Sequence, residues 1–215
     1  MDQSEPTGDP GMGAPTPPTP PPSQPAGGWA APPPPIQAGP AGFYYADVPN
    51  RSIAYIIDAI ILGIVNIIAY AILSGIGLNP VTVDLSSPNL VSYNFIAGVI
   101  AAIVGLAISG GYFLYTWTAM RGTLGMKALG MQVGNAGDGK TLTMEQAVRR
   151  WIALGAPFSI AQAFNPAPAL GILIGLLALG WFIYLLWTTY SSPTKQGFHD
   201  KFANTMVVKA ARAAG

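Results

Sequence analysis

Residues 51–77, RSIAYIIDAIILGIVNIIAYAILSGIG, decide the fold class of this chain. After Arg51 the stretch contains a single acidic or basic side chain, Asp58. An α-helix rises about 1.5 Å per residue, so about 20 apolar residues cross the hydrocarbon core of a bilayer. The stretch therefore predicts a membrane-spanning helix.

The two charges of this helix are expected to share one face. Asp58 follows Arg51 by almost two helical turns, which places it about 10 Å deeper, and Tyr55 lies on the same face. Insertion of a carboxylate at this depth costs about 2.5–3.5 kcal/mol, so Asp58 needs a partner inside the protein. The candidate partners are Tyr55 and hydroxyl side chains late in the next apolar stretch: Tyr112, Tyr115, Thr116 and Thr118.

Composition and charge place the whole chain in a bilayer. Of its 215 residues 51% are hydrophobic and 9% are charged, too few charges for the surface of a soluble domain of this size. Lys and Arg are absent from residues 52–120 and 151–194, so the basic loop 121–150 and the basic C-terminal tail are expected on the cytoplasmic side. The chain has no cysteine, which excludes disulfides and cysteine metal sites.

The predicted architecture is an all-α integral membrane protein, a four-helix transmembrane bundle in a domain over residues 43–208. Two basic segments on one side require an even number of crossings between them, and Asn165 to Pro168 supply a turn. Pro157 makes the third helix short or re-entrant. The expected helices cover about 51–77, 93–120, 146–165 and 168–190, and a C-terminal tail covers 209–215.

Residues 1–42 are predicted to form a disordered, Pro/Gly-rich tail, because 15 of the 21 prolines precede residue 51. Such a tail is a solvated tether or, through its PxxP spacing, a ligand for a partner domain. Small residues recur every fourth position in the second helix and permit close helix packing or a homo-oligomer: Ala97, Ala101, Gly105 and Ser109.

The basic loop is expected to contain a small β-hairpin, formed by MQVGN at 131–135 and KTLT at 140–143 around Gly-Asp-Gly. Thr143 and Gln146 match a capping box that opens the next helix. Residues 134–141, GNAGDGKT, also match a phosphate-binding loop letter for letter. About thirty residues between two membrane segments leave no room for the α/β domain this loop requires, so a turn is the preferred interpretation.

Four separated motifs resemble the RDD family. They are Arg51, Asp58 within the first helix, the TLGMKALGMQV stretch with its Asp-Gly, and a closing His199-Asp200 followed by a TxVV-like end at 205–208. Arg51, Asp58 and Asp200 are identified with the family's namesake residues. The resemblance implies a multi-pass protein of the bacterial inner membrane, and cation/proton antiport is suggested for certain members.

Two functions remain open. In the first, the protein is a structural membrane module in which Asp58 organises helix packing, and the loop and tail engage partners. In the second, Asp58 is the exchanging carboxylate of a cation/proton antiporter. We expect Asp200 to pair with Arg149 or Arg150, and His199 to be a surface or interface residue.

No enzymatic, cofactor-binding, metal-binding or nucleic-acid-binding role is expected, because no catalytic or ligand set accompanies His199. The bilayer itself is the partner that the apolar segments require.

The charge pattern predicts that both termini and loop 121–150 face the cytoplasm. Reporter fusions at residues 82, 135 and 210 are expected to report outside, inside and inside. An external signal at residue 135 overturns this topology, whereas disagreement at residue 210 alone leaves three crossings.

Overall fold

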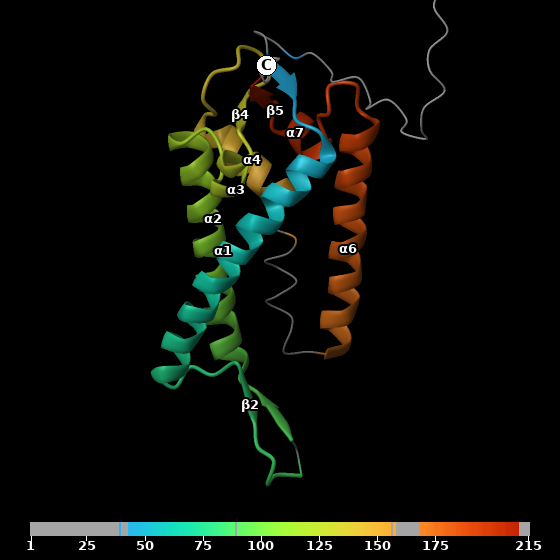
Figure 1. Ribbon diagram of the computed structural model, residues 1–215. Coiled ribbons are helices and arrows are strands. Elements are labelled where there is room, and N and C mark those ends of the chain that lie inside the picture. The colour runs from blue at the N-terminus through green and yellow to red at the C-terminus, as the bar shows by residue number, and fades with distance from the viewer. Residues whose placement is uncertain (1–38, 40–42, 89, 156, 158–167, 211–215) are drawn as a thin grey trace, which may run out of the picture. The chain divides into compact units, whose positions relative to one another are not determined.

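The computed structural model describes residues 39, 43–88, 90–155, 157 and 168–210. Outside this part of the chain lie residues 1–38 and 40–42 of the predicted disordered tail, residues 158–167, which include the end of the predicted third helix and most of the turn after it, and residues 211–215. The elements, in chain order, are β1 (Phe43–Tyr45), α1 (Val48–Gly75), β2 (Val81–Val83), β3 (Val91–Tyr93), α2 (Phe95–Ala119), α3 (Leu124–Ala128), β4 (Met131–Asn135), α4 (Met144–Leu154), α6 (Pro168–Ser191), α7 (Phe198–Phe202) and β5 (Thr205–Ala210) (Figure 1).

Three helices among the described residues are long and apolar enough to span a membrane: Val48–Gly75, Phe95–Ala119 and Ile172–Ser191. These correspond to three of the four predicted spans. Of the predicted span 146–165, the described part forms α4, an amphipathic helix of 11 residues that ends at Leu154. The predicted capping box at its start is confirmed, with Thr143 and Gln146 each bonding the other's backbone.

Strands from three distant parts of the chain form an antiparallel sheet with the order β1-β5-β4. Met131 lies opposite Lys209 and Asn135 opposite Thr205, while Tyr45 lies opposite Val208. The predicted hairpin between 131–135 and 140–143 is therefore wrong. Gly139 turns the chain there with φ +70°, but the strand that pairs with β4 is β5, whose residues Met206, Val207 and Val208 are buried.

No helix opens at Lys140 or Thr141, because the residues between the turn and α4 are irregular. The resemblance of residues 134–141 to a phosphate-binding loop thus lacks the helix N-terminus on which such a loop depends.

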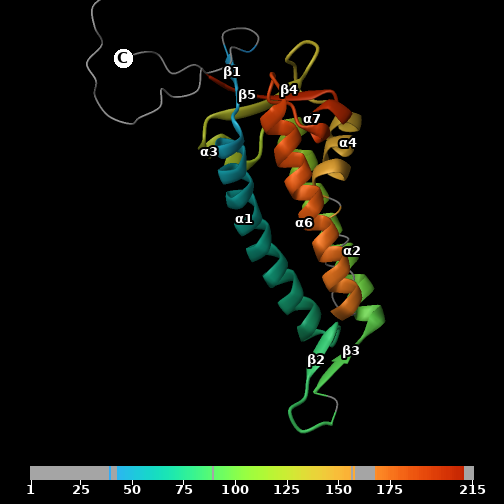
Figure 2. The same ribbon diagram turned by 90° about the vertical axis from the view of Figure 1, so that its right-hand side faces the viewer.

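The sheet, α3, α4 and α7 gather at one end of the three spans, and we call this group of elements the cap (Figures 1 and 2). At the opposite end, β2 and β3 pair as a hairpin in the segment predicted to be an external polar loop. The two views place this hairpin well away from the sheet.

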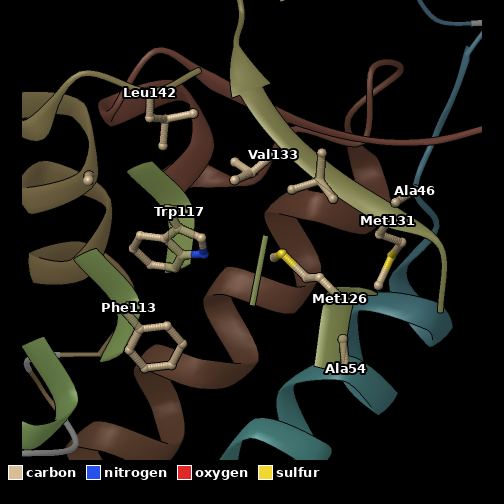
Figure 3. Close-up of a cluster of buried hydrophobic side chains, with 10 residues drawn as sticks. Ala46, Ala54, Phe113, Trp117, Met126, Met131, Val133 and Leu142 are labelled. Carbon is tan, nitrogen blue, oxygen red and sulfur yellow. The ribbon is translucent and has the colours of Figure 1, made fainter. Parts of the chain in front are cut away.

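The main hydrophobic core lies where the cap meets the spans (Figure 3). Trp117 from α2 and Val133 from β4 are fully buried there, and the ring centroids of Phe113 and Trp117 lie 5.0 Å apart. Lipid-facing positions of the spans stay exposed, as expected for helices whose apolar surfaces contact hydrocarbon. The cap is therefore packed onto the membrane helices as part of one folded unit.

The small residues of α2 serve contacts within this chain. A Cβ atom at Gly105 would lie 3.4 Å from the Asn66 side chain of α1, and Ser109 accepts a hydrogen bond of 3.1 Å from the Trp151 indole of α4. Two positions of this stripe thus face α1 and α4 of the same chain, and a homo-oligomer through small-residue faces stays a prediction.

Candidate functional site

Asp200 lies at the centre of a buried ion-pair cluster. Its carboxylate is fully buried and accepts from Arg51 Nη1 at 2.6 Å, from Arg150 Nη1, and from the Gly197 backbone N–H at 3.2 Å. Arg51 belongs to the first turn of α1 and Arg150 to α4, whereas Asp200 belongs to α7. One carboxylate therefore joins three elements that are far apart in the chain.

Both guanidinium groups make further bonds that fix their positions. Arg51 donates through Nε to the Ala46 carbonyl at 2.9 Å and through Nη2 to the Val207 carbonyl at 3.4 Å. Arg150 donates to Thr205 Oγ1 at 2.6 Å and lies over the Trp117 ring, 5.2 Å from its centroid. The cluster thereby also holds the β1–α1 connection and β5.

Attraction between the opposite charges in this cluster offsets the free-energy cost of burying them. Burial alone raises the pKa of the Asp200 carboxyl, but the charges of Arg150 and Arg51 hold it well below its usual range. For His199 burial dominates and lowers the imidazole pKa to about 4, although Asp200 acts in the opposite direction. At neutral pH the cluster therefore contains an ionised Asp200 beside a neutral His199.

Asp58 forms a second buried junction, farther along α1. Its side chain is 2% exposed, and Oδ1 accepts from Tyr112 Oη at 2.6 Å and from the Gly125 backbone N–H at 2.8 Å. Tyr112 comes from α2 and Gly125 from α3, so Asp58 connects α1 to both elements. A buried carboxylate in this position satisfies two donors that would otherwise face apolar surroundings.

These contacts cap the first turn of α3, where backbone N–H groups lack helical partners. The Leu124 N–H bonds Tyr112 Oη at 3.1 Å, the Gly125 N–H bonds Asp58, and the Met126 N–H bonds Thr123 Oγ1 at 3.1 Å. Side chains from two membrane helices thus provide two of the three caps.

Glycine at position 125 is required by the close approach of α3 to α1. A Cβ atom there would lie 2.1 Å from the Ala54 carbonyl oxygen and 3.0 Å from Asp58 Oδ1. The Gly125 N–H can reach the Asp58 carboxylate only because the two backbones come this near. In the sequence, Gly125 lies within the TLGMKALGM stretch. The spacing of residues in this stretch does not show that one of its glycines packs against α1.

The structure brings together some of the predicted site residues and separates others. Arg150 pairs with Asp200, but Arg149 is exposed and pairs with Glu145 in its own helix. Arg51 bonds Asp200, although its spacing in the sequence placed it with Asp58.

Of the hydroxyl side chains predicted to bond Asp58, some lie at the carboxylate and others bond elsewhere or are exposed. Tyr112 donates to the carboxylate, whereas Tyr115 is 65% exposed and Thr116 donates to the Tyr112 carbonyl of its own helix. Thr118 likewise bonds the Leu114 carbonyl. Tyr55 lies beside Asp58 in the wall of a cavity. His199 is buried at the interface of α7 with the spans.

The cavity, about 70 Å³ in volume, lies between the two junctions. Asp58, Arg51, Arg150 and His199 reach its wall, and most of the remaining wall is apolar. Within the described residues no group of three or more His, Asp or Glu side chains could hold a metal ion.

Replacing Asp200 with Asn is expected to destabilise the protein by about 3–5 kcal/mol, because two buried guanidinium groups lose their counterion. Thermal unfolding in detergent measures the loss, and limited proteolysis should show faster cleavage of the C-terminal segment while membrane insertion is retained. Glu145→Gln is the matched control, since it removes an exposed pair within one helix worth about 0.5 kcal/mol. Equal protection of the segment in wild type and Asp200→Asn contradicts the anchoring role.

Gly125→Ala is expected to cost about 1–3 kcal/mol, the usual penalty of overpacking, because α3 must move away from Ala54. Gly111→Ala in α2 is the control, since a Cβ atom there meets nothing within 4 Å. Thermal unfolding of both purified variants provides the comparison. Equal stabilities would show that α3 does not depend on this close approach.

Comparison with known proteins finds a sequence relative and a matching family. The chain is 28% identical over 176 residues to an uncharacterized protein, YxaI, of Bacillus subtilis (strain 168), a match that covers 79% of this chain and 97% of YxaI. No solved structure matches the chain significantly. The family model described as the RDD family matches residues 45–204, which include Arg51, Asp58 and Asp200. The chain is therefore a member of the RDD family.

Proposed function

We propose that this protein is a membrane scaffold module that presents a folded cap on the cytoplasmic side of the bilayer. The proposal rests on the hydrogen bonds and ion pairs that the two buried carboxylates form. Asp58 and Asp200 each bind groups from distant segments, and together they join α1 to α2, α3, α4 and α7. Such bonds define a single arrangement of the cap on the helices.

Contacts from α6 support the same role. The Phe198 N–H bonds Thr188 Oγ1 at 3.1 Å, and the Trp181 indole donates to the Ala153 carbonyl at 2.8 Å. The third span is thereby tied to α7 and to α4. Every described span has a polar bond to the cap, which favours a rigid platform for a partner protein.

The proline-rich segment 1–42 supplies the proposed means of recruiting that partner. It precedes β1, which pairs with β5 in the cap. PxxP sequences fit aromatic grooves of partner domains. The basic residues of loop 121–150 favour the cytoplasm for the cap side of the membrane.

A second candidate function, cation/proton antiport, is favoured by one observation. The cavity near the cap reaches Asp58, so a carboxylate inside the span borders a space of about 70 Å³. An acid that exchanges a proton for a cation needs such access. The scaffold proposal instead assigns Asp58 to hydrogen bonding and assigns no catalytic role to any residue.

The two functions differ in whether Asp58 must ionise. Asn can accept the bonds from Tyr112 and Gly125 but cannot titrate, whereas Ala leaves both donors unsatisfied at about 1–3 kcal/mol each. For a scaffold we expect Asp58→Asn to retain most of the thermal stability and Asp58→Ala to lose it.

The measurement is dissipation of a pH gradient when Na⁺ or K⁺ is added to proteoliposomes that contain wild type, Asp58→Asn or Asp58→Ala. A wild-type response that Asp58→Asn abolishes while remaining folded contradicts the scaffold as a complete account. Absence of any response from well-folded wild type, across several cations and pH values, eliminates the antiporter.

A further inference from the structure

We infer that the exposed face of α7 is a membrane-contact surface, which places Phe198 and Phe202 in the interfacial layer of the leaflet on the cap side. Its partner is bilayer lipid, at the level where acyl chains meet headgroups. This inference concerns how the cap meets the bilayer, and it is independent of both proposed functions. The two unlike faces of α7, its continuity with α6 and its level along that helix each support it.

The short helix α7 has one face in the protein and one face outside it. His199, Asp200 and Ala203 are 6%, 0% and 1% exposed and fix the helix in the cap. Phe198 and Phe202 are 37% and 49% exposed, and their rings stack with centroids 5.9 Å apart and planes 9° apart. The outward face of α7 is therefore aromatic.

This aromatic face continues the surface of a membrane-spanning helix. The Phe198 ring contacts Trp181 and Tyr184 of α6, with centroids 5.5 Å and 5.9 Å apart. Tyr184 in turn contacts Trp187, which is 63% exposed. These three residues of α6 belong to the candidate span Ile172–Ser191, whose exposed side chains lie against hydrocarbon and headgroups in a bilayer. The lipid that covers α6 therefore also meets the ring of Phe198.

The level of α7 along α6 matches the membrane interface. The Phe198 N–H bonds Thr188 Oγ1 at 3.1 Å, and a Cβ atom at Gly197 would lie 2.2 Å from Thr189 Oγ1. Thr188 lies three residues before the end of α6 at Ser191, which is about 5 Å along the helix axis. The interfacial layer on each side of the hydrocarbon core is about 5–7 Å thick. Figures 1 and 2 show α7 beside this end of α6, so it lies where the core meets the headgroups.

The chemistry of the surface favours this layer. Aromatic side chains are enriched where acyl chains meet headgroups. Lys201 is exposed on α7, and Lys195 Nζ lies 5.3 Å from the ring centroid of Tyr190 at the end of α6. Among the described residues neither lysine forms an ion pair. Their ammonium groups can therefore reach lipid phosphates while their stems and the rings lie against acyl chains.

The test measures the membrane depth of α7 by spin labelling. The chain has no cysteine, so Phe198→Cys and Phe202→Cys each carry one nitroxide in protein reconstituted into phosphatidylcholine–phosphatidylglycerol vesicles. Electron paramagnetic resonance compares collisions of the label with oxygen, which concentrates in the bilayer, and with a water-soluble nickel chelate. We expect a several-fold higher oxygen-to-nickel ratio at both positions than at Lys140→Cys. Lys140 is the control in the cap, with a side chain that is 81% exposed.

Two further variants complete the comparison. Leu179→Cys, at a position of α6 that is 53% exposed, supplies the lipid-facing reference. Lys201→Cys keeps both rings of α7 and carries the test where a ring substitution prevents folding, which thermal unfolding detects. A folded α7 variant with nickel access equal to that at position 140 overturns the proposal and leaves the face to water or a soluble partner. Low access to both oxygen and nickel means that protein covers the face, which also overturns it.

Discussion

The arrangement of the cap depends on one carboxylate placed between two buried guanidinium groups. Removing Asp200, Arg51 and Arg150 from water is costly, and this cost is recovered only when the geometry is close and the remaining donors are bonded. Here Arg51 also bonds two backbone carbonyls and Arg150 also bonds Thr205. An alternative packing of the cap would leave at least one of these charges without a partner, so the cluster selects one arrangement among those that the apolar core alone would allow.

The second junction, around Asp58, depends on the close approach of the α3 backbone to the α1 backbone. The short helix α3 cannot hold itself in place by its own five residues, since an isolated helix of this length is unstable. Asp58 and Tyr112 bind its first N–H groups, and Gly125 lets its backbone reach that of α1. The acid within the membrane span is therefore already satisfied by protein groups on one oxygen. This explains how a carboxylate is accommodated below the membrane surface.

Features that depend on local sequence could be predicted. The described spans follow from long apolar runs, and the Thr143 cap follows from four consecutive residues. The pairing of Arg150 with Asp200 followed from placing both on one side of the membrane. Contacts across long sequence separations could not be predicted in this way. Local turn chemistry favoured a hairpin within 131–143, yet β4 pairs with a strand seventy residues later, and Arg51 reaches a residue 149 positions away.

The order of strands in the cap sheet has a consequence for synthesis of the protein. The central strand is β5, which follows every described span in the chain, whereas its neighbours β1 and β4 are made much earlier. The spans must therefore enter the membrane while Arg51 and Arg150 still lack Asp200 and both outer strands lack their shared partner. The cap can be completed only after the chain has been translated through β5, and a chain that stops before Thr205 leaves β1 and β4 without the strand that they share.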